Sequence, residues 1–382
     1  MHLASSLKNF CLVLLLLVLR AIQAQTTVNG SFMHDGINRT YSFYIPASYN
    51  PAQPVPLIIG LHGTSSSGAL FSQYRNFKPI ADTANFIMVH PDGTTILGQK
   101  FWNYGNVAGS TVDDVGFLVA LIDTISAHYA INQNRVYSVG MSNGGFMTYY
   151  LACQTNRFAA IGSVTGSMGT TMYANCNPQR PTPSIHIHGT ADAINPYAGN
   201  STSKGIKDVN RFWVNQNGCD TVPALFPVAN TNTTDNATAE RYLYGNGING
   251  HTVELFKVTG GEHTWPGSPM PGSSDVTCMD FDARIEIWRF FRQYQLSAPV
   301  SVKEHKADDV NLWPNPTQGT VYINAGNHSV TDIVIMNLQG QVVDSYSGIK
   351  LSSFDLSHLS KGNYVAKVSG PDFYVLKKLL LY

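Results

Sequence analysis

The chain has 382 residues, of which 43% are hydrophobic and 13% charged, and its formal net charge is +0 at pH 7. This composition is typical of a folded exported enzyme or adhesive protein and argues against a disordered chain. The balanced charge provides no basic surface for nucleic acid and no polybasic patch for anionic lipid, so we expect a neutral or polymeric partner.

The first 24 residues have the layout of a secretory signal peptide. Lys8 precedes an apolar run at 10–19, and small residues end at Ala24. The apolar run is shorter than the roughly 20 residues that a membrane-spanning helix needs, which argues against a membrane anchor. We therefore expect cleavage near Ala24 and a secreted or cell-surface protein whose mature chain has no membrane span.

Composition divides the rest of the chain into two domains. Residues 297–310 are polar and charged without an apolar period, which indicates a linker. Residues 25–296 alternate strand-like and helix-like runs, which predicts an α/β fold: a mostly parallel sheet with helices on both faces. Its strand-like runs are 55–61, 86–90, 136–139, 161–164, 185–188 and 253–258, and helical spacing occurs at 117–129 and 281–291.

Residues 311–382 differ from the rest because they have no helical period. Their β-rich runs are short, and residues 337–340 are typical of a hairpin turn. The pattern predicts a small C-terminal all-β sandwich in which no residues have catalytic spacing.

The sequence Gly140-Met141-Ser142-Asn143-Gly144 lies between a predicted strand and a predicted helix. In that position a G-x-S-x-G motif is a nucleophile elbow, whose sharp turn lifts the serine hydroxyl toward substrate. In parallel sheets ligands bind at the carboxyl ends of the strands, and Ser142 follows such an end. We therefore predict that Ser142 is a nucleophile, with a plain turn serine as the alternative.

A serine nucleophile needs a histidine base and a carboxylate that orients the histidine. In this topology the chain order is Ser, then Asp or Glu, then His. Asp192 follows the strand-like run at 185–188, and His263 follows the last strand-like run. Both are thus expected at the same sheet edge as Ser142. The alternatives are Asp208 and Asp220 for the acid, and His251, His186 and His188 for the base.

Other residues of this site follow from the geometry of acyl transfer. One oxyanion donor is the N–H of Asn143, directly after the nucleophile, and we assign the second to Thr64 in the loop after an early strand. Trp265, two residues after His263, and Trp102 are expected to line a substrate cleft, with core packing as the alternative for each.

Removing Cys11 with the first 24 residues leaves four of the five cysteines, namely Cys153, Cys176, Cys219 and Cys278. In an oxidising compartment an even number favours two disulfides. Of the three possible pairings we favour Cys153–Cys176 and Cys219–Cys278, because each would join neighbouring segments. No C-x-x-C spacing occurs, so we expect neither a metal site nor a cofactor.

Five ordered motifs resemble those of a known family, and they lie at residues 55–63, 112–118, 135–145, 187–192 and 261–267. Together they resemble the polyhydroxybutyrate depolymerase and feruloyl esterase group of α/β-hydrolases, which is carbohydrate esterase family one in the broad sense. The resemblance implies that Ser142, Asp192 and His263 form the catalytic triad.

The same resemblance bears on the cysteines. It implies a disulfide between Cys153 and Cys176. Relatives often have a cysteine in the segment that here reads Tyr244-Gly245-Asn246-Gly247, and this departure leaves the partner of Cys219 open.

The C-terminal domain has a resemblance of its own, carried by residues 313–319, 338–343, 356–364 and 377–382. These segments resemble the C-terminal sorting domain of the type IX secretion system. The resemblance implies that the type IX machinery is a partner, and that the tail is removed or attached to the surface after export. A carbohydrate-binding module is the alternative.

These observations predict a secreted serine carboxylic-ester hydrolase that forms an acyl-enzyme on Ser142. Without a visible polymer-binding module, the expected substrates are plant cell-wall esters, meaning feruloyl or acetyl groups on xylan. A polyhydroxybutyrate depolymerase or hydroxyalkanoate oligomer hydrolase is the alternative among esterases. A catalytically silent surface binding protein on a hydrolase scaffold is the alternative of another class.

Overall fold

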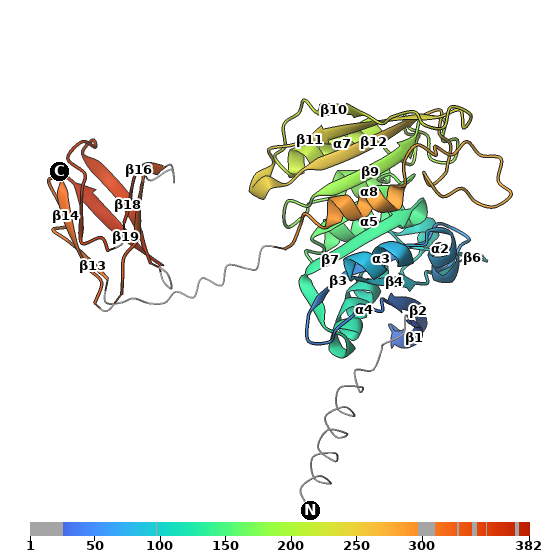
Figure 1. The fold of residues 1–382 in the computed structure, drawn as a ribbon, viewed down its shortest axis with the longest axis horizontal. Helices are drawn as coiled ribbons and strands as arrows, with labels where there is room; N and C mark the ends of the chain where they lie inside the picture. The colour runs from blue at the N-terminus through green and yellow to red at the C-terminus, as the bar shows by residue number, and fades with distance from the viewer. Residues whose placement is uncertain are drawn as a thin grey trace, which may run out of the picture. The chain divides into compact units, whose positions relative to one another are not determined.

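The computed structural model describes residues 26–96, 98–296, 310–326, 328–337, 342–348, 350–370 and 374–382. The predicted signal peptide at 1–24 and most of the predicted linker at 297–310 lie outside these residues. The chain forms two compact units, Met1–Leu296 and Ser297–Tyr382 (Figure 1). In the described part of the chain, no helix has both the length and the apolar character needed to cross a membrane.

One large sheet organises the first unit. Among the described residues its order is β1-β2-β4-β3-β7-β8-β9-β12-β11-β10. The strands from β4 to β12 in this order pair in parallel, and the outer pairs are antiparallel. The strand bounds are β1 Thr26–His34, β2 Ile37–Ile45, β3 Val55–Leu61, β4 Ile87–Pro91, β7 Ile131–Met141, β8 Ala160–Val164, β9 Ser184–Gly189, β10 Ala224–Pro227, β11 Thr238–Tyr244 and β12 Val253–Thr259.

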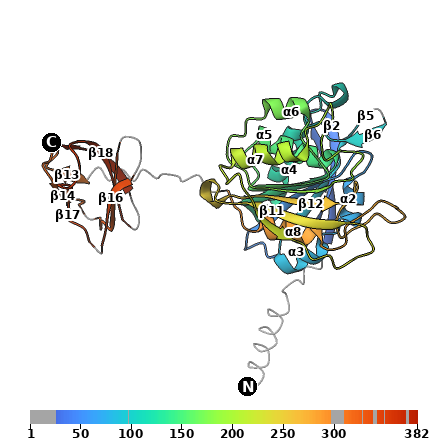
Figure 2. The ribbon, with the colours of Figure 1, turned by 90° about the horizontal axis from the view of Figure 1, so that it is seen from above.

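Helices cover both faces of this sheet, as Figure 2 shows with the sheet seen on edge. One face packs on α4 (Asp114–His128), α5 (Asn143–Gln154), α6 (Thr170–Asn175) and α7 (Ile206–Gln216). The other packs on α2 (Gly68–Tyr74), α3 (Lys78–Ala84) and α8 (Ala283–Phe291). Strand β3 contributes Leu57, Ile59 and Leu61 to the first core and Ile58 to the second, because successive side chains point to opposite faces.

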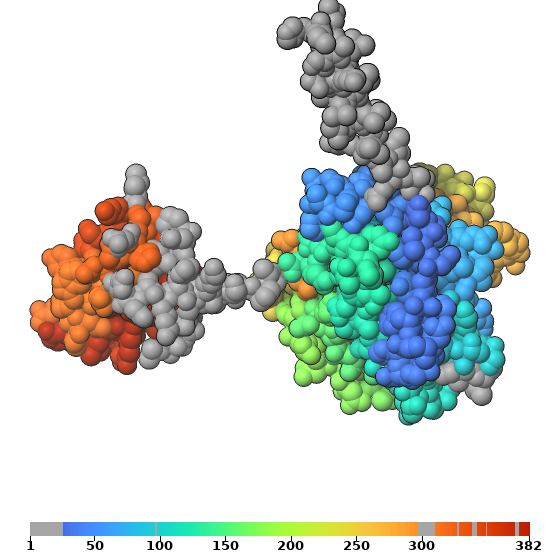
Figure 3. Space-filling view, turned by 90° about the horizontal axis from the view of Figure 1, so that it is seen from below, coloured from blue at the N-terminus to red at the C-terminus, as the bar shows by residue number. Residues whose placement is uncertain are grey.

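The β1–β2 hairpin extends the sheet beyond its parallel part and lies beside α4, as Figure 3 shows for the dark blue and green segments. Phe32 of β1 packs on Phe117 of α4, with ring centroids 5.5 Å apart. The buried Arg39 guanidinium donates to Asp114 at 2.5 Å. Removing one partner of such a pair strongly destabilises the fold, because the other charge stays buried without a partner.

The predicted α/β fold is confirmed, and its strands end where the predicted site residues begin. Each of the strand-like runs in the first unit corresponds to a central strand. The antiparallel edge strands β1, β2, β10 and β11 were not predicted. The short β5 (Thr94–Ile96) and β6 (Gln99–Phe101) form a separate hairpin.

The second unit is all β, as predicted. In its described residues, β13 (Asn311–Trp313), β14 (Thr320–Asn324) and β17 (Ser353–Asp355) form one sheet. A second sheet has the order β16-β15-β18-β19, with bounds Val342–Ser347, Asp332–Met336, Gly362–Ser369 and Tyr374–Leu381. Inward side chains of both sheets form a separate hydrophobic core. Most of the predicted turn at 337–340 lies outside the described residues.

Candidate active site

Ser142 lies at the sharp turn between β7 and α5. Its backbone has φ 55° and ψ −122°, a conformation that residues other than glycine rarely adopt and that costs about 1–3 kcal/mol. The flanking glycines are required by close packing: a Cβ on Gly140 would lie 2.1 Å from the Gly144 carbonyl oxygen, and one on Gly144 would lie 2.1 Å from that of Leu61. This geometry is that of a nucleophile elbow.

Asp192 and His263 form a hydrogen-bonded pair, although 71 residues separate them in the chain. Asp192 follows β9 and is buried, and His263 lies on the loop after β12. The distance between His263 Nδ1 and Asp192 Oδ2 is 2.8 Å. Because a carboxylate only accepts, Nδ1 carries the proton and Nε2 is left as the acceptor. This is the tautomer that a general base needs.

The Asp192 carboxylate is surrounded by donors. Its Oδ1 accepts from the N–H groups of Ile194 at 2.9 Å and Asn195 at 2.8 Å. Burial raises the pKa of this carboxyl, but hydrogen bonds from His188, His263 and the Asn195 N–H hold it well below its usual range. Asp192 is therefore ionised at neutral pH and orients His263.

Ser142 and His263 open onto the same two cavities. One, of about 220 Å³, is mainly apolar, and its lining includes Leu70, Phe71 and Met270. The other, of about 680 Å³, is more polar. Both cavities thus give substrate access to the two residues. The predicted alternatives Asp208, Asp220, His251, His186 and His188 line neither cavity.

The predicted oxyanion donors flank Ser142. Asn143 is the first residue of α5, and Thr64 lines both cavities with Ser142. The loop that carries Thr64 comes close to Ser142: a Cβ on Gly63 would lie 3.3 Å from the Ser142 Cβ. The Asn143 side chain does not face substrate: its Oδ1 accepts from the Trp102 N–H at 2.6 Å and its Nδ2 donates to the Trp102 carbonyl at 3.1 Å. Only the backbone N–H of Asn143 is suited to the oxyanion role.

His62 supports the same loop, a role that sequence reasoning missed. Its Nε2 accepts from the Gly93 N–H at 2.9 Å, so Nδ1 carries the proton and donates to the Gly63 carbonyl at 2.7 Å. Burial lowers the pKa of His62, which favours this neutral form. The only sequence signal was its position directly before Gly63.

The expectation that Trp102 and Trp265 contact substrate is wrong for this structure. Both side chains are fully buried and line neither cavity. Trp265 packs edge-on against Phe71, which does line the apolar cavity, with ring centroids 5.7 Å apart. The Trp102 indole N–H donates to the His62 carbonyl at 3.1 Å. Both tryptophans therefore support the cavity walls from behind.

The cysteines form one of the two expected disulfides. Cys153 and Cys176 are bonded. Cys219 and Cys278 are free and buried, which corrects the expected second pair. The reason is that they belong to hydrophobic cores on opposite faces of the sheet, so no disulfide can bridge them.

Two groups of side chains in the described residues have metal-binding geometry, His34–Asp35–Asp113 and Asp235–Cys278–Asp280. Neither contains a triad residue. In the second group burial raises the pKa of the Cys278 thiol to about 12, which opposes the thiolate form that binds metals.

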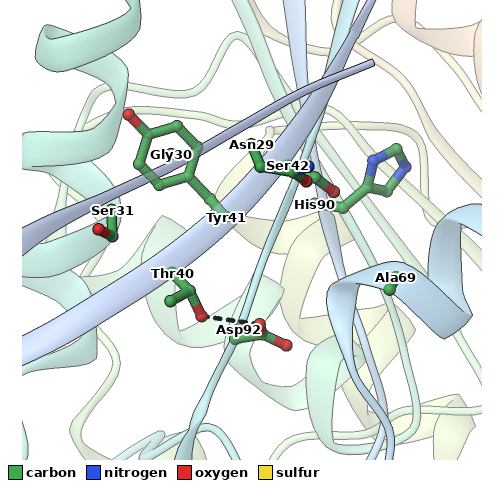
Figure 4. A pocket seen from close by; sticks show the side chains of 9 residues that line it. All are labelled: Asn29, Gly30, Ser31, Thr40, Tyr41, Ser42, Ala69, His90 and Asp92. Atoms are coloured by element: carbon green, nitrogen blue, oxygen red, sulfur yellow. Dashed lines mark hydrogen bonds between the residues drawn. The ribbon is translucent and has the colours of Figure 1, made fainter.

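A separate hollow of about 540 Å³ lies over the edge strands β1 and β2 beside α2 (Figure 4). Its Asp92 is already bonded, accepting from Thr40 Oγ1 at 2.8 Å and from the Gly68 N–H at 3.0 Å. Burial lowers the pKa of His90 to about 3, so its imidazole is neutral. In Figure 4 the Asp92 carboxylate lies apart from His90 and is bonded to Thr40, so it does not orient this histidine, and we do not regard the hollow as the active site.

Comparisons with known proteins agree with the α/β fold of the first unit and the separate C-terminal unit. Residues 73–210 match the model of the prolyl oligopeptidase family, and residues 311–382 match the secretion system C-terminal sorting domain. A solved acetyl xylan esterase from Aspergillus awamori has a TM-score of 0.50 and 15% sequence identity, covering 70% of this chain and 99% of its own. That likeness shows the fold.

Curated relatives include several esterases. A bifunctional acetylxylan esterase/xylanase of Neocallimastix patriciarum is 27% identical over 299 residues, which cover 77% of this chain but only 39% of the relative. Feruloyl esterase D of Neurospora crassa is 29% identical, covering 70% of this chain and 88% of its own. A poly(3-hydroxybutyrate) depolymerase of Ralstonia pickettii is 33% identical over 156 residues, 37% of this chain and 31% of the relative. The chain therefore has an α/β-hydrolase fold and is similar to feruloyl and acetylxylan esterases and to a polyhydroxybutyrate depolymerase, and its residues 311–382 match the secretion system C-terminal sorting domain.

Proposed function

We propose that this protein is a serine carboxylic-ester hydrolase with Ser142 as nucleophile, His263 as general base and Asp192 as the group that orients it. The observation that carries the proposal is the hydrogen bond between the buried Asp192 and the partly buried His263, because His263 lines the same cavities as the strained Ser142 elbow. Strain at a serine that shares its cavities with such a histidine is expected for a nucleophile and has no role in a surface binding protein.

The reaction proceeds in two half-steps. His263 Nε2 takes the Ser142 proton while Oγ attacks the ester carbonyl carbon, and the N–H groups of Asn143 and Thr64 bind the developing oxyanion. The imidazolium then returns the proton to the leaving alcohol, which leaves an acyl-enzyme. Water, deprotonated by His263, releases the acid and restores the serine. Asp192 remains ionised throughout and stabilises the imidazolium.

The two cavities support a substrate with unlike halves. The apolar cavity, whose lining includes Leu70, Phe71 and Tyr74, suits an aromatic or other apolar acyl group. The larger cavity has amide and hydroxyl side chains, among them Asn200 and Thr202, which suit the hydroxyl groups of a sugar. We therefore infer plant cell-wall esters, feruloyl or acetyl groups on xylan, as the substrate class.

A second candidate, hydrolysis of hydroxybutyrate oligomers, is favoured by the identity to the Ralstonia pickettii depolymerase. Rates on methyl ferulate, acetylated xylan and hydroxybutyrate oligomers, measured side by side, distinguish the two. A leading rate on the oligomers would replace cell-wall esters as the substrate class while leaving the serine mechanism in place.

The C-terminal sorting domain indicates export. We propose that the protein is secreted or surface-attached through the type IX machinery, after an N-terminal signal peptide has directed it across the inner membrane.

The mechanism is tested by Ser142→Ala. We expect a folded protein whose kcat on p-nitrophenyl acetate falls by several orders of magnitude, because the catalytic unit has lost its nucleophile. The matched control is Ser167→Ala: Ser167 is buried, donates to the Lys204 carbonyl at 2.6 Å and lines neither cavity. Near-normal rates in Ser142→Ala would contradict the mechanism.

The assignment of the acyl cavity is tested by Leu70→Ala. Leu70 is 40% exposed at the apolar cavity, so the substitution removes acyl contacts without opening the core. We expect KM for methyl ferulate to rise severalfold while hydrolysis of p-nitrophenyl acetate changes little, since an acetyl group is too short to use the cavity. Equal effects on both esters would place the acyl group elsewhere.

A further inference from the structure

Three buried polar rings lie in a line behind Asp192. Tyr149 comes from α5, and His186 and His188 come from β9, where two-residue spacing points both rings to one face of the sheet. The Tyr149 hydroxyl lies 2.5 Å from His186 Nδ1, and His186 Nε2 lies 3.0 Å from His188 Nδ1. His188 Nε2 lies 3.3 Å from Asp192 Oδ2 and 2.8 Å from the Asn195 carbonyl oxygen.

These contacts join the interior to the triad. The Asp192 oxygen that meets His188 is the same Oδ2 that accepts from His263 Nδ1. Tyr149, His186 and His188 are each at most 2% exposed. Burying three polar side chains is unfavourable unless every one is hydrogen-bonded, and apolar side chains would fill the same space at lower cost.

The end of the line fixes where the protons lie. Asp192 Oδ2 and the Asn195 carbonyl only accept, so His188 Nε2 must carry a proton. A neutral His188 then has a lone pair on Nδ1, which the His186 Nε2–H satisfies. His186 Nδ1 is left as an acceptor, and the Tyr149 hydroxyl supplies its proton. With all rings neutral, this is the arrangement that satisfies every contact.

The surroundings favour neutral groups. Burial raises the pKa of Tyr149, so it remains a phenol that can donate. Burial and the nearby His188 hold the pKa of His186 well below its usual range, so it has one N–H and one lone pair. Asp192 is faced by His188 from β9, by His263 from the loop after β12 and by N–H groups of its own loop.

We propose that His188 is a positioning residue for the triad: its Nε2–H, which donates to the Asn195 carbonyl at 2.8 Å, also faces Asp192 Oδ2 at 3.3 Å, and Tyr149 acts through His186 to hold His188 in the tautomer that carries this proton. The inference rests on the proposed esterase function. If the proposal is right, the negative charge on Asp192 Oδ2 is stabilised by His188 as well as by His263. Without that donor the Asp192 charge is more concentrated on the His263 side, so the imidazolium form is held more strongly.

The test compares His188→Phe with His188→Gln. Phenylalanine keeps a ring but has no donor, whereas the glutamine side-chain amide places an N–H near the position of Nε2. For His188→Phe we expect kcat to fall about tenfold or more with KM little changed, because Asp192 has lost one of the groups that fix its position and so orients His263 less well for the proton transfer from Ser142. The acidic limb of the pH profile of kcat/KM should move to higher pH. His188→Gln should restore both toward the wild-type values.

Tyr149→Phe tests the far end of the line and keeps the proposal testable if His188→Phe does not fold. It removes one hydroxyl and keeps the ring, which stacks on Trp213. The matched control is Tyr137→Phe, because the buried Tyr137 hydroxyl donates to the Tyr294 carbonyl at 2.6 Å in the core on the other sheet face. Both variants should lose similar thermal stability, but only Tyr149→Phe should lower kcat and shift the acidic limb.

Failure of this inference can be told apart from failure of the proposed function. Wild-type protein inactive on every ester would overturn the function. Wild-type activity with His188→Phe and His188→Gln alike in kcat and pH profile would overturn the role of His188 alone. A readout independent of turnover is the downfield proton NMR resonance of His263 Nδ1–H. It should shift in His188→Phe and not in Tyr137→Phe, and an unchanged resonance would also overturn the inference.

Discussion

At the scale of single residues, Asp192 combines burial with an unusual number of donors. Two backbone N–H groups and two imidazoles meet one carboxylate. Each donor stabilises the charged form, so together they outweigh the desolvation that burial imposes. The carboxylate is therefore both ionised and fixed in direction, and it needs both properties to hold His263 in the basic tautomer.

The tautomer argument makes Asp192→Asn more informative than a deletion of the side chain. The substitution preserves shape, but an amide nitrogen facing Nδ1 would favour the proton on Nε2 and so remove the base. We expect kcat to fall by about 10³–10⁴ while KM changes little. Crystallography or circular dichroism should show an unchanged fold. A loss below tenfold would contradict the role of Asp192.

Buried histidines predict how stability depends on pH. Burial, with the nearby Lys78, lowers the pKa of His90 to about 3, and burial with Arg180 lowers that of His251 to about 4. Both folded values lie below the unfolded value near 6.5, so the unfolded chain binds more protons. The stability that these two neutral histidines contribute is therefore complete above pH 6.5 and is lost as pH falls toward 4.

Urea unfolding at pH 7 and pH 5 measures this loss. Each histidine should lower the free energy of unfolding by about 2 kcal/mol at pH 5. His90→Gln removes one of the two histidines that take up a proton on unfolding. It should therefore reduce the difference in the free energy of unfolding between pH 7 and pH 5 by a similar amount. Equal stability at pH 7 and pH 5 would contradict the buried neutral state.

What the sequence could predict at this scale depends on chain geometry. Ser142, Asp192 and His263 each follow a strand-like run, and parallel strands bring their carboxyl ends to one edge, so their meeting was predictable. Trp265 was misjudged because residue type does not reveal on which side of a loop a ring lies. The link from Asp192 to Tyr149 depends on ring positions that no local pattern encodes.

At the scale of elements, the central strands were predictable from the sequence, whereas the edge strands, which are defined by their pairing with distant segments, were not. The central strands are continuous apolar runs because helices cover both faces, and such runs are visible in a sequence. The edge strand β10 is exposed throughout although its four residues are apolar, and β1 has no buried residue, so neither has the long buried apolar run that marks a central strand. The disulfide joins Cys153 in α5, the helix that follows Ser142, to Cys176 just after α6, so it links these two helices covalently.

Thiol titration tests the cysteine assignment. The protein from residue 25 onward, unfolded in guanidinium without reductant, should release two thiols per chain, from Cys219 and Cys278. The folded protein should react slowly because both are buried. Replacing Cys153 and Cys176 by serine should lower the free energy of unfolding by about 2–4 kcal/mol and leave kcat nearly unchanged. If no thiol reacted in the unfolded protein, Cys219 and Cys278 would form the second disulfide after all, and the assignment as free thiols would be wrong.

At the scale of the whole molecule, the two units have separate hydrophobic cores. The second unit buries Val321, Ile333 and Leu379 among its own strands, and the triad residues all come from the first unit. Catalysis and stability of the hydrolase unit should therefore not depend on the tail. The tail's match to a sorting domain gives it a role in export instead.

Deleting residues 297–382 tests this division of roles. We expect the truncated enzyme to keep its kcat and its melting temperature, because the deletion removes no residue of either core of the first unit. In a host with type IX secretion the full chain should reach the medium or the cell surface, whereas the truncated chain should stay in the periplasm. Esterase assays on each cell fraction measure this directly. If the truncated enzyme still reached the medium but no longer adsorbed to insoluble xylan, the tail would be a binding module, because export and adsorption fail in different fractions.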